Sequence, residues 1–493
     1  MSKYLIAVYD IGKTNKKFIV FNENLKPCYK KTAKIGEIVR NGILCDDVER
    51  IIKWMHDTLK EEYKGIKVRS LAITTFGATG ALLDDKGELV IPVVSYNQEI
   101  SNGIRDRFYR TFGSPEDLYM RTGTPPYGQL LNFGVQLFWI RTTMPEAYNK
   151  TKTILFLPQY LSYVITGVKT IEITSVGCHT YLYDILDKDW SDVAKGLEVD
   201  SKTPSEFEDV WEAIGYAKWI RNAVVTTGIH DSNASLLPFL LTRGKEDFVL
   251  ASTGTWCVFM YPHARFQPKR DDLYKDVLYY IDAFGRPTRA SRFKGGYEFD
   301  YYISMIKGMF SPPQGFLDMD VDIAILKDIL RRKNSFIVPT LTPGSGQFPK
   351  SKGRIIGKDV FSRNLKTAYH LLCLSIAIQT YFALEAVLGG IKRGVKVIVV
   401  GGFAKNRMYM KILATLLRYH DIKVLKTEYE DLTSLGTAIT AKMAYEGIKP
   451  KDVEKEIIEE AIREVYIKPI EDIDERDLME YVDIFKEHCL HSE

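Results

Sequence analysis

The order of strands and turns between residues 4 and 74 constrains this chain more than any other feature. An apolar run at 4–9 indicates a strand, and the polar turn DIGKTNK at 10–16 separates it from a second strand at 17–21. A third strand to about residue 35, apolar residues at helical spacing over 47–63 and a strand at 68–74 follow. Three strands in a meander, then a helix and a strand, predict an α/β unit.

A similar succession begins again after Arg243. We predict strands at 248–251, 256–260 and 277–283, then much later a helix over 365–388, a strand at 395–400 and a helix after Gly402. Two domains, 1–242 and 243–493, are therefore expected, with a charged helical tail from about residue 446. This layout resembles two ribonuclease-H-like domains of the actin and hexokinase superfamily around a central cleft. The pattern alone also fits an unrelated two-domain α/β protein.

Composition excludes several classes of function. The chain has 493 residues and a net charge of +4, from 67 basic and 63 acidic side chains, which argues against nucleic-acid and membrane partners. Six scattered cysteines without a C-x-x-C pair fit a reducing, cytoplasmic location. The first apolar run is too short for a signal peptide. The longest apolar stretch, 371–388, contains Gln379 and Glu385 and is expected to be a buried helix.

The turn at residues 10–17 has the groups that phosphoryl transfer requires. Gly12 permits a tight turn, Thr14 offers a hydroxyl, and Lys13, Lys16 and Lys17 offer positive charge. Asp10 is a carboxylate for Mg²⁺. An ordinary polar hairpin would have the same composition, so the turn alone leaves both interpretations open.

The segment GIHDSNA at 228–234 has an aspartate that is suited to general-base catalysis. A substrate hydroxyl becomes an effective nucleophile when a carboxylate within hydrogen-bond reach accepts its proton. Asp231 precedes an apolar stretch, so we expect it at the start of a helix. The alternative is that Asp231 is only the N-cap of that helix, with His230 as a packed histidine.

Two later turns resemble nucleotide-contacting turns. STGTW at 252–256 again places small hydroxyl residues and a glycine between two strands. VVGGFAKN at 399–406 joins a strand to a helix, where two glycines permit close approach of a flat base and Asn406 caps the helix or contacts the nucleotide. The second turn does not match G-x-G-x-x-G, which disfavours a dinucleotide fold.

Taken in order, these segments resemble the FGGY carbohydrate kinases, closest to the rhamnulokinase-like and L-fuculokinase-like group. The resemblance covers about the first 445 residues. Besides the segments above, it rests on TTFGATG at 74–80, LLD at 82–84, YMRTG at 119–123, LPQYLSY at 157–163, ITG at 165–167, Glu172 and Thr174. Two departures stand out: Lys13 occupies a position where many members have a small residue, and SYNQE at 95–99 lacks an aspartate and an arginine common in several subfamilies.

The resemblance implies a site for ATP, Mg²⁺ and a sugar. Asp231 is implied as the general base and Asp10 as the metal residue. The implied nucleotide-binding residues are Gly12, Lys13, Thr14, Asn15, Lys17, Gly254, Thr255, Gly401, Gly402 and Asn406. The implied sugar-binding residues are Phe76, Gly77, Asn97, Gln98, His230, Asp231 and Ser232.

The expected activity is ATP-dependent phosphorylation of a small sugar, a ketose such as rhamnulose, fuculose, xylulose or ribulose. Two alternatives on the same fold stay open: a catalytically weak sugar-binding regulatory protein and an actin-like or chaperone-like ATPase switch. Sugar-stimulated ADP production separates the kinase from the switch. Assembly as a homodimer is also left open by the sequence.

Overall fold

A computed structural model describes residues 3–63 and 67–491 of the chain. By internal packing the chain divides into two units, which are described separately below. The first unit comprises residues 1–244, 279–287 and 431–462, and the second comprises residues 245–278, 288–430 and 463–493. Both units are built from mixed sheets covered by helices, so the predicted α/β class is confirmed.

The first unit contains a seven-stranded sheet. Six strands follow the order β11-β12-β6-β1-β2-β3, and β13 pairs with β6. β1, β2 and β3 form the predicted antiparallel meander, and β6 lies parallel to β1. The strands are β1 (Leu5–Ile11), β2 (Asn15–Asn22), β3 (Pro27–Lys34), β6 (Val68–Thr75), β11 (Ala213–Tyr216), β12 (Val224–Thr226) and β13 (Ile229–His230).

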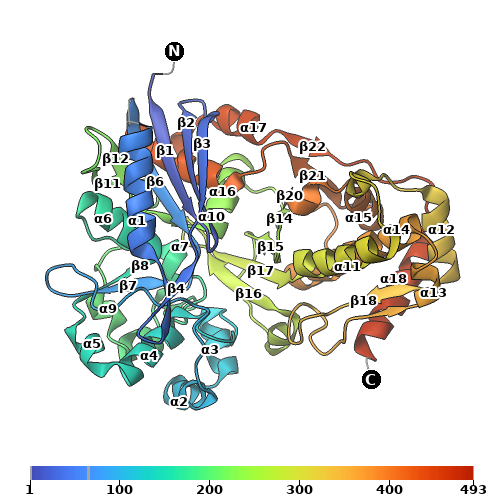
Figure 1. Ribbon diagram of the computed structural model, residues 1–493, viewed down its shortest axis with the longest axis horizontal. Helices are drawn as coiled ribbons and strands as arrows, with labels where there is room; N and C mark the ends of the chain where they lie inside the picture. The colour runs from blue at the N-terminus through green and yellow to red at the C-terminus, as the bar shows by residue number, and fades with distance from the viewer. Residues whose placement is uncertain (1–2, 64–66, 492–493) are drawn as a thin grey trace. The chain divides into compact units, whose positions relative to one another are not determined.

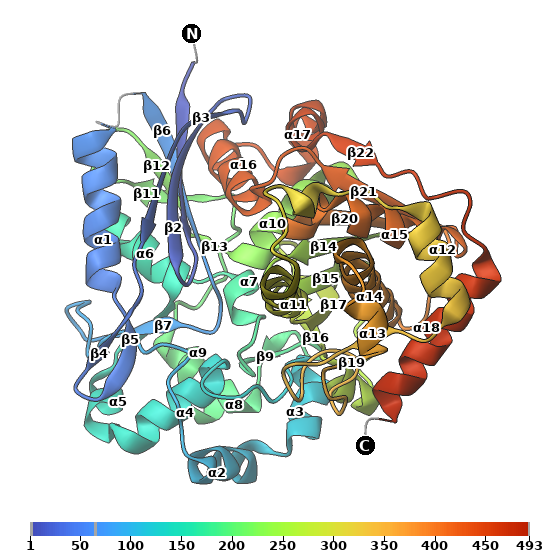
Figure 2. The ribbon, with the colours of Figure 1, turned by 45° about the vertical axis from the view of Figure 1, so that its right-hand side comes forward.

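Helices cover both faces of this sheet (Figure 1). α1 (Val48–Asp57), capped by Asp47, and α6 (Leu157–Thr166) pack on one face, where Val48, Ile51 and Met55 join the core. α10 (Asp231–Thr242) and α16 (Leu432–Glu446) pack side by side against the sheet, as Figures 1 and 2 show. A Cβ on Gly436 would lie 1.7 Å from the carbonyl oxygen of Ala234, so only glycine permits this approach of the two helices.

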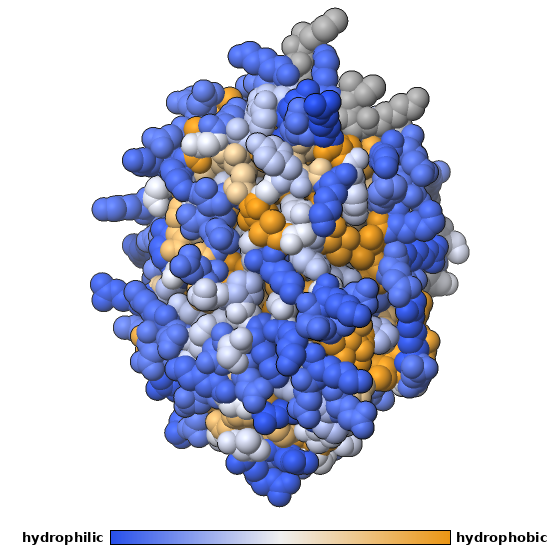
Figure 3. Space-filling view, turned by 90° about the vertical axis from the view of Figure 1, so that its left-hand side faces the viewer, coloured by the Kyte–Doolittle hydropathy of each residue, from blue (hydrophilic) through white to orange (hydrophobic). Residues whose placement is uncertain are grey.

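The remainder of the first unit consists of further strands and helices. It includes β4 (Glu37–Arg40), β5 (Ile43–Asp46), β7 (Gly80–Leu83), β8 (Thr153–Phe156), α2 (Asn102–Phe112), α3 (Pro115–Thr122), α4 (Phe133–Thr143), α5 (Pro145–Lys150), α7 (Ile173–Val176) and α17 (Lys455–Ile462). On the left-hand side of Figure 1, hydrophobic side chains form patches among hydrophilic ones (Figure 3). Scattered exposed apolar groups of this kind are normal on protein surfaces.

Most of another seven-stranded sheet belongs to the second unit, in the order β16-β17-β15-β14-β20-β21-β22, although residues 279–281 of β16 and Pro287 of β17 are grouped with the first unit. β14 is antiparallel to β15 and parallel to β20. The strands are β14 (Phe248–Thr253), β15 (Cys257–Tyr261), β16 (Val277–Ile281), β17 (Pro287–Phe293), β20 (Lys396–Gly401), β21 (Lys423–Thr427) and β22 (Glu464–Tyr466). The predicted strand at 277–283 forms β16, but the neighbour of β15 is β17, which the sequence did not indicate.

The core of the second unit is organised around α14 (Leu365–Leu388). Its helices include α11 (Gly295–Phe310), α12 (Ile323–Arg332), α15 (Arg407–Arg418) and α18 (Glu475–Leu490). Asn364 caps the start of α14, and Gly389, with a φ of 72°, ends it. α14 is long and apolar enough to cross a membrane, yet 89% of its most apolar window is buried in the protein. The expectation of a buried helix is therefore confirmed.

Candidate active-site groups in the two units

The turn between β1 and β2 is closed by short-range contacts. A Cβ on Gly12 would lie 2.9 Å from the carbonyl oxygen of Asn15, so the turn favours glycine there. The buried Lys16 ammonium donates hydrogen bonds to the carbonyl oxygens of Gly12, Lys13 and Ile35 at 2.7–2.9 Å. Burial lowers the pKa of Lys16 to about 8. Lys16 thus fixes the backbone of the turn, and its ammonium uses its hydrogen bonds on backbone carbonyl oxygens. Thr14 and Asn15 are exposed.

Asp10 lies at the end of β1 within a cluster of charged groups. Lys17 Nζ is 2.8 Å from Asp10 Oδ2 and 3.1 Å from Asp431 Oδ1, and the Ser434 hydroxyl donates to Asp10 Oδ2 at 3.4 Å. Burial raises the pKa of Asp10, and the negative charges of Asp431 and Asp231 add to this effect against the attraction of Lys17. Although burial opposes it, the two carboxylates hold the pKa of Lys17 above its ordinary value.

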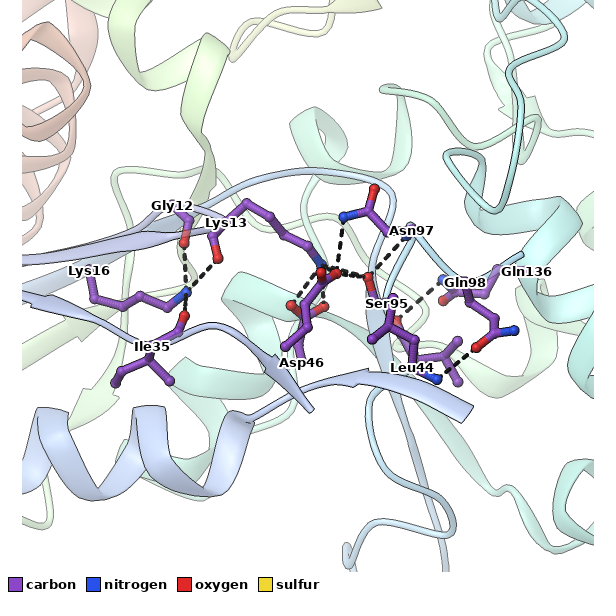
Figure 4. Close-up of polar contacts among 12 residues, drawn as sticks. Gly12, Lys13, Lys16, Ile35, Leu44, Asp46, Ser95, Asn97, Gln98 and Gln136 are labelled. Atoms are coloured by element: carbon purple, nitrogen blue, oxygen red, sulfur yellow. Dashed lines mark hydrogen bonds and ion pairs between the residues drawn. The ribbon is translucent and has the colours of Figure 1, made fainter. Parts of the chain in front are cut away.

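Lys13 is directed away from the turn that contains it (Figure 4). Its ammonium bonds both carboxylate oxygens of Asp46 at 2.7 and 2.9 Å and the Ser95 hydroxyl at 2.8 Å. Glu37 Oε1 is 3.0 Å away, and the rings of Phe76 and Tyr96 lie 4.8 and 4.3 Å from the nitrogen. The structure therefore places the Lys13 charge beside the segment at 95–99.

The two amides of that segment differ in what they contact. Gln98 Oε1 accepts from the backbone N–H of Leu44 at 2.7 Å, and its Nε2 donates to the Glu99 carbonyl at 2.8 Å. Asn97 Nδ2 donates to Glu37 Oε1 at 3.0 Å. Gln98 is thus engaged at both ends by backbone, whereas the Asn97 side chain bonds Glu37 through its nitrogen.

Asp231 is the first residue of α10, and His230 is the residue at the N-cap position. The interpretation of Asp231 as the N-cap is therefore wrong. Its Oδ1 accepts from the Ser232 backbone N–H at 2.6 Å and from the Ser232 hydroxyl at 3.3 Å, and His230 Nε2 lies 3.2 Å from the same oxygen. About a third of the Asp231 side chain, 35%, is exposed, so the carboxylate is accessible to a substrate.

His230 connects the aspartate to other predicted sugar segments. It is buried, which lowers its pKa and favours the neutral ring. Its Nδ1 lies 3.4 Å from Asn233 Nδ2, and its backbone N–H donates to the Thr174 hydroxyl. A Cβ on Gly77 would lie 3.1 Å from His230 Nε2. The structure therefore brings Gly77, Thr174, His230 and Asp231 together at one end of the first unit's sheet.

In the second unit, the turn after β14 is joined to the Gly401-Gly402 turn after β20. The Thr253 hydroxyl donates to the Val400 carbonyl at 2.5 Å and accepts from the Phe403 backbone N–H at 3.0 Å. Gly401 has a φ of 86°, and a Cβ there would lie 2.2 Å from the Thr253 carbonyl oxygen. Asn406 caps α15 by accepting from the Tyr409 N–H, as one of its two predicted roles requires.

These turns border a cavity of about 370 Å³ in the second unit. That volume suits a small ligand or a nucleoside. The N-terminus of α11 lies beside it, and a Cβ on Gly296 would be 2.1 Å from the Gly254 carbonyl oxygen. The cavity is lined by Thr253, Gly254, Thr255, Gly296, Phe299, Asp300, Leu317, Asp318, Gly402, Phe403, Lys405 and Asn406.

Sequence reasoning missed several of these groups. Gly296 was detectable, because the pair Gly295-Gly296 precedes a helix in the same way as the other glycine turns. Glu37 and Asp46 carry no motif that would reveal their contact with Lys13. Asp431 is separated from Lys17 by 414 positions, and no local signal predicts that contact.

Known proteins resemble both parts of the chain. Residues 4–219 match the N-terminal domain of the FGGY family of carbohydrate kinases, and residues 245–450 match the carbohydrate kinase FGGY C-terminal domain. A carbohydrate kinase from Novosphingobium aromaticivorans superposes with a TM-score of 0.79 at 25% identity, covering 99% of this chain and 98% of that one. This likeness confirms the expected two-domain fold.

Two curated relatives are more limited matches. The rhamnulokinase of Halalkalibacterium halodurans is 26% identical over 264 residues, which cover 51% of this chain and 55% of that protein. The L-fuculokinase of Escherichia coli (strain K12) is 24% identical over 281 residues, 54% of this chain and 58% of that protein. The matched part thus spans little more than half the length of these relatives. With both domains matched in order, the chain belongs to the FGGY family of carbohydrate kinases.

Proposed function

We propose that this protein transfers the γ-phosphoryl group of ATP to a hydroxyl of a small ketose. The observation that carries the proposal is the Asp231 carboxylate, which is partly exposed at the start of α10 beside Gly77 and His230. Rhamnulose and fuculose are the first candidates, because the matched relatives are a rhamnulokinase and an L-fuculokinase. Xylulose and ribulose are further candidates.

In this mechanism Asp231 is the general base. The Ser232 groups bind Oδ1, so we assign Oδ2 to accept the proton of the attacking hydroxyl. The hydroxyl oxygen forms a bond to the γ-phosphorus as the bond from that phosphorus to the leaving oxygen of ADP breaks. The neutral His230 ring, 3.2 Å from Oδ1, helps to orient the carboxylate. Gly77 and Asn97 are proposed to contact the sugar.

We assign different parts of the nucleotide to groups of each unit. The base and ribose are proposed to occupy the cavity beside Gly401-Gly402 and Gly296 in the second unit. Within the second unit, the turn at Gly254-Thr255 is proposed to contact phosphate. Within the first unit, the same role is proposed for the turn at 12–15 and for Lys17. Backbone N–H groups of such turns and a nearby cation stabilise the charge that develops on transferred phosphoryl oxygens.

Asp10 fits a magnesium ion by its chemistry. Carboxylate oxygens are preferred ligands of Mg²⁺. The contacts from Lys17 and Ser434 both end at Oδ2 of Asp10, which leaves Oδ1 for the ion or its water among the groups that the structure describes. A bound Mg²⁺ would neutralise phosphate charge during transfer.

The experiment is ADP release from Mg·ATP with L-rhamnulose, L-fuculose, D-xylulose and L-ribulose. Asp231→Asn should lower kcat by roughly 10²- to 10⁴-fold with a smaller change in KM for the sugar. Asp192→Asn is the matched control, because Asp192 is also the first residue of a helix, α8 (Asp192–Gly196), and is exposed. ADP production that no sugar stimulates would support the ATPase-switch alternative instead. Near-normal turnover by Asp231→Asn would remove Asp231 from the general-base role.

A further inference from the structure

The contacts of Lys13 with Glu37, Asp46 and Ser95, here called the Lys13 network, link the turn at 10–17 to the segment at 95–99. The Lys13 backbone belongs to the turn that Lys16 fixes, and its ammonium reaches Ser95, Glu37 and Asp46 (Figure 4). Its side chain is only 17% exposed, and that of Asp46 is 3% exposed. A cation enclosed by two carboxylates, a hydroxyl and two aromatic rings has little freedom to move.

Glu37 determines which way the Asn97 amide faces. Burial raises the pKa of Glu37, but hydrogen bonds from Ser95 and the charge of Lys13 outweigh it and hold the pKa below its ordinary value. An ionised carboxylate only accepts hydrogen bonds, so the Asn97 nitrogen must be the atom that faces Glu37. The Asn97 backbone N–H donates to Ser95 Oγ at 3.0 Å, which holds the main chain as well.

The charge of Glu37 therefore also determines which way the Asn97 carbonyl oxygen faces. Asn97 Oδ1 points away from the network in Figure 4. A carbonyl oxygen accepts hydrogen bonds and cannot donate them. Gln98, by contrast, uses its oxygen on Leu44 and its nitrogen on Glu99. Of the two amides in this segment, Asn97 is thus the one whose oxygen can distinguish a ligand group that donates a hydrogen bond from one that only accepts.

We propose that Lys13 and Glu37 are positioning residues for sugar specificity, because they fix Asn97 so that its carbonyl oxygen accepts a hydrogen bond from one sugar hydroxyl. The inference rests on the proposed kinase function and deepens it. It requires a hydrogen-bond donor on the sugar at that position. A fluorine or a hydrogen in place of this hydroxyl leaves the carbonyl oxygen without its partner, and sites of this kind discriminate strongly against such analogues.

Glu37→Gln tests the role of the carboxylate. A glutamine amide can donate to Asn97 Oδ1, so it permits the Asn97 amide to turn and present its nitrogen. The experiment compares kcat/KM for the best of the four ketoses with its monodeoxy and monodeoxyfluoro analogues, using wild type, Glu37→Gln and Glu49→Gln. Glu49 is a matched control because it pairs with Arg40 on the surface of the same unit.

In the wild type, fluorine at one position should lower kcat/KM at least about tenfold, as hydrogen does there. In Glu37→Gln, the loss of kcat/KM caused by fluorine should become about tenfold smaller relative to the loss caused by hydrogen at the same position. The KM for ATP should change less than about twofold. Glu49→Gln should retain the wild-type pattern. The analogue pattern is the set of kcat/KM values for the ketose and its deoxy and deoxyfluoro analogues. If Glu37→Gln leaves this pattern unchanged, or changes only kcat and the KM for ATP, the inference is overturned while the kinase function stands.

Two further results, an inactive wild type and a Glu37→Gln variant that does not fold, can be told apart from a failure of the inference alone. If the wild type phosphorylates none of the four ketoses, the proposed function fails and the inference fails with it. If Glu37→Gln does not fold, judged by its thermal melting, the same comparison is made with Lys13→Met and Lys13→Arg. Lys13→Arg retains a cation for both carboxylates and should keep the analogue pattern, whereas Lys13→Met should lose it. Equal patterns in these two variants would also overturn the inference.

Discussion

Lys17 and Asp431 lie 3.1 Å apart, from Nζ to Oδ1, although 414 positions separate them in the sequence. Asp10 contacts the same ammonium, so one cation serves two carboxylates within the first unit. The β1–β2 turn is thereby tied to the start of α16, and the charge balance around Asp10 depends on a residue that no motif identifies.

We predict that Asp431→Asn lowers the free energy of unfolding of the first unit by about 1–3 kcal/mol, because the partly buried Lys17 ammonium loses one charged partner. The pKa of Asp10 should fall, since the charge of Asp431 contributes to its elevation. Urea denaturation measures the first effect. Asp57→Asn, which breaks the surface pair with Lys53, is the control and should cost less than about 1 kcal/mol. Equal costs for the two variants would contradict the prediction.

Gly401→Ala should weaken ATP binding specifically. The new Cβ would lie 2.2 Å from the Thr253 carbonyl oxygen, so the two turns that border the cavity must separate. We expect KM for ATP to rise about tenfold or more, equivalent to about 1.4 kcal/mol, with KM for the sugar unchanged. Gly394→Ala is the control, because Gly394 also has a positive φ, 77°, but open space around it. A similar rise in both variants would assign the effect to backbone strain rather than to the turn contact.

His370 should make the second unit less stable in mild acid. Its Nε2 accepts from the Asp322 N–H at 2.8 Å, and its Nδ1 faces the Lys366 carbonyl at 2.7 Å, which requires a neutral ring. Burial lowers the pKa of His370 below 6.5. The unfolded chain therefore binds a proton that the folded chain does not, and stability is lost as pH falls below about 6.5.

The measurement is the difference in unfolding free energy between wild type and His370→Gln, from urea denaturation at pH 7.5, 6.5 and 5.5. The advantage of the wild type should shrink by up to about 1.4 kcal/mol per pH unit below the unfolded pKa. A difference that stays constant across this range would show that His370 does not titrate between the two states.

The sequence was most informative where periodicity and turn chemistry agree. β1, β2, β6 and α1 lie within a few residues of their predicted positions, because apolar runs or a helical apolar pattern are bounded there by polar turns. β17 was missed because two of its buried residues, Arg289 and Arg292, are charged. Those charges are neutralised by Asp272 and Asp276 at 2.7 and 2.8 Å, and such pairing is visible only in three dimensions.

Motif resemblance brought together Gly77, His230 and Asp231, which the structure indeed places in contact range. The resemblance located Lys13 in the turn but could not indicate which groups the end of its long flexible side chain contacts. That direction depends on Asp46 and Ser95, which follow in other segments. The assignment of the site residues to ATP and sugar stays a prediction for the experiments above.

The return of α16 to the first unit also affects how the chain can be made. Its residues pack against α10, β1 and β6, and Gly436 fits closely over Ala234. A ribosome releases the first strands of this unit early, yet the helix that covers them emerges only after residues 245–430, which include most of the second unit, have been synthesised. The nascent first half must therefore wait with an apolar surface uncovered, and a fragment ending at residue 244 would retain that exposed surface permanently.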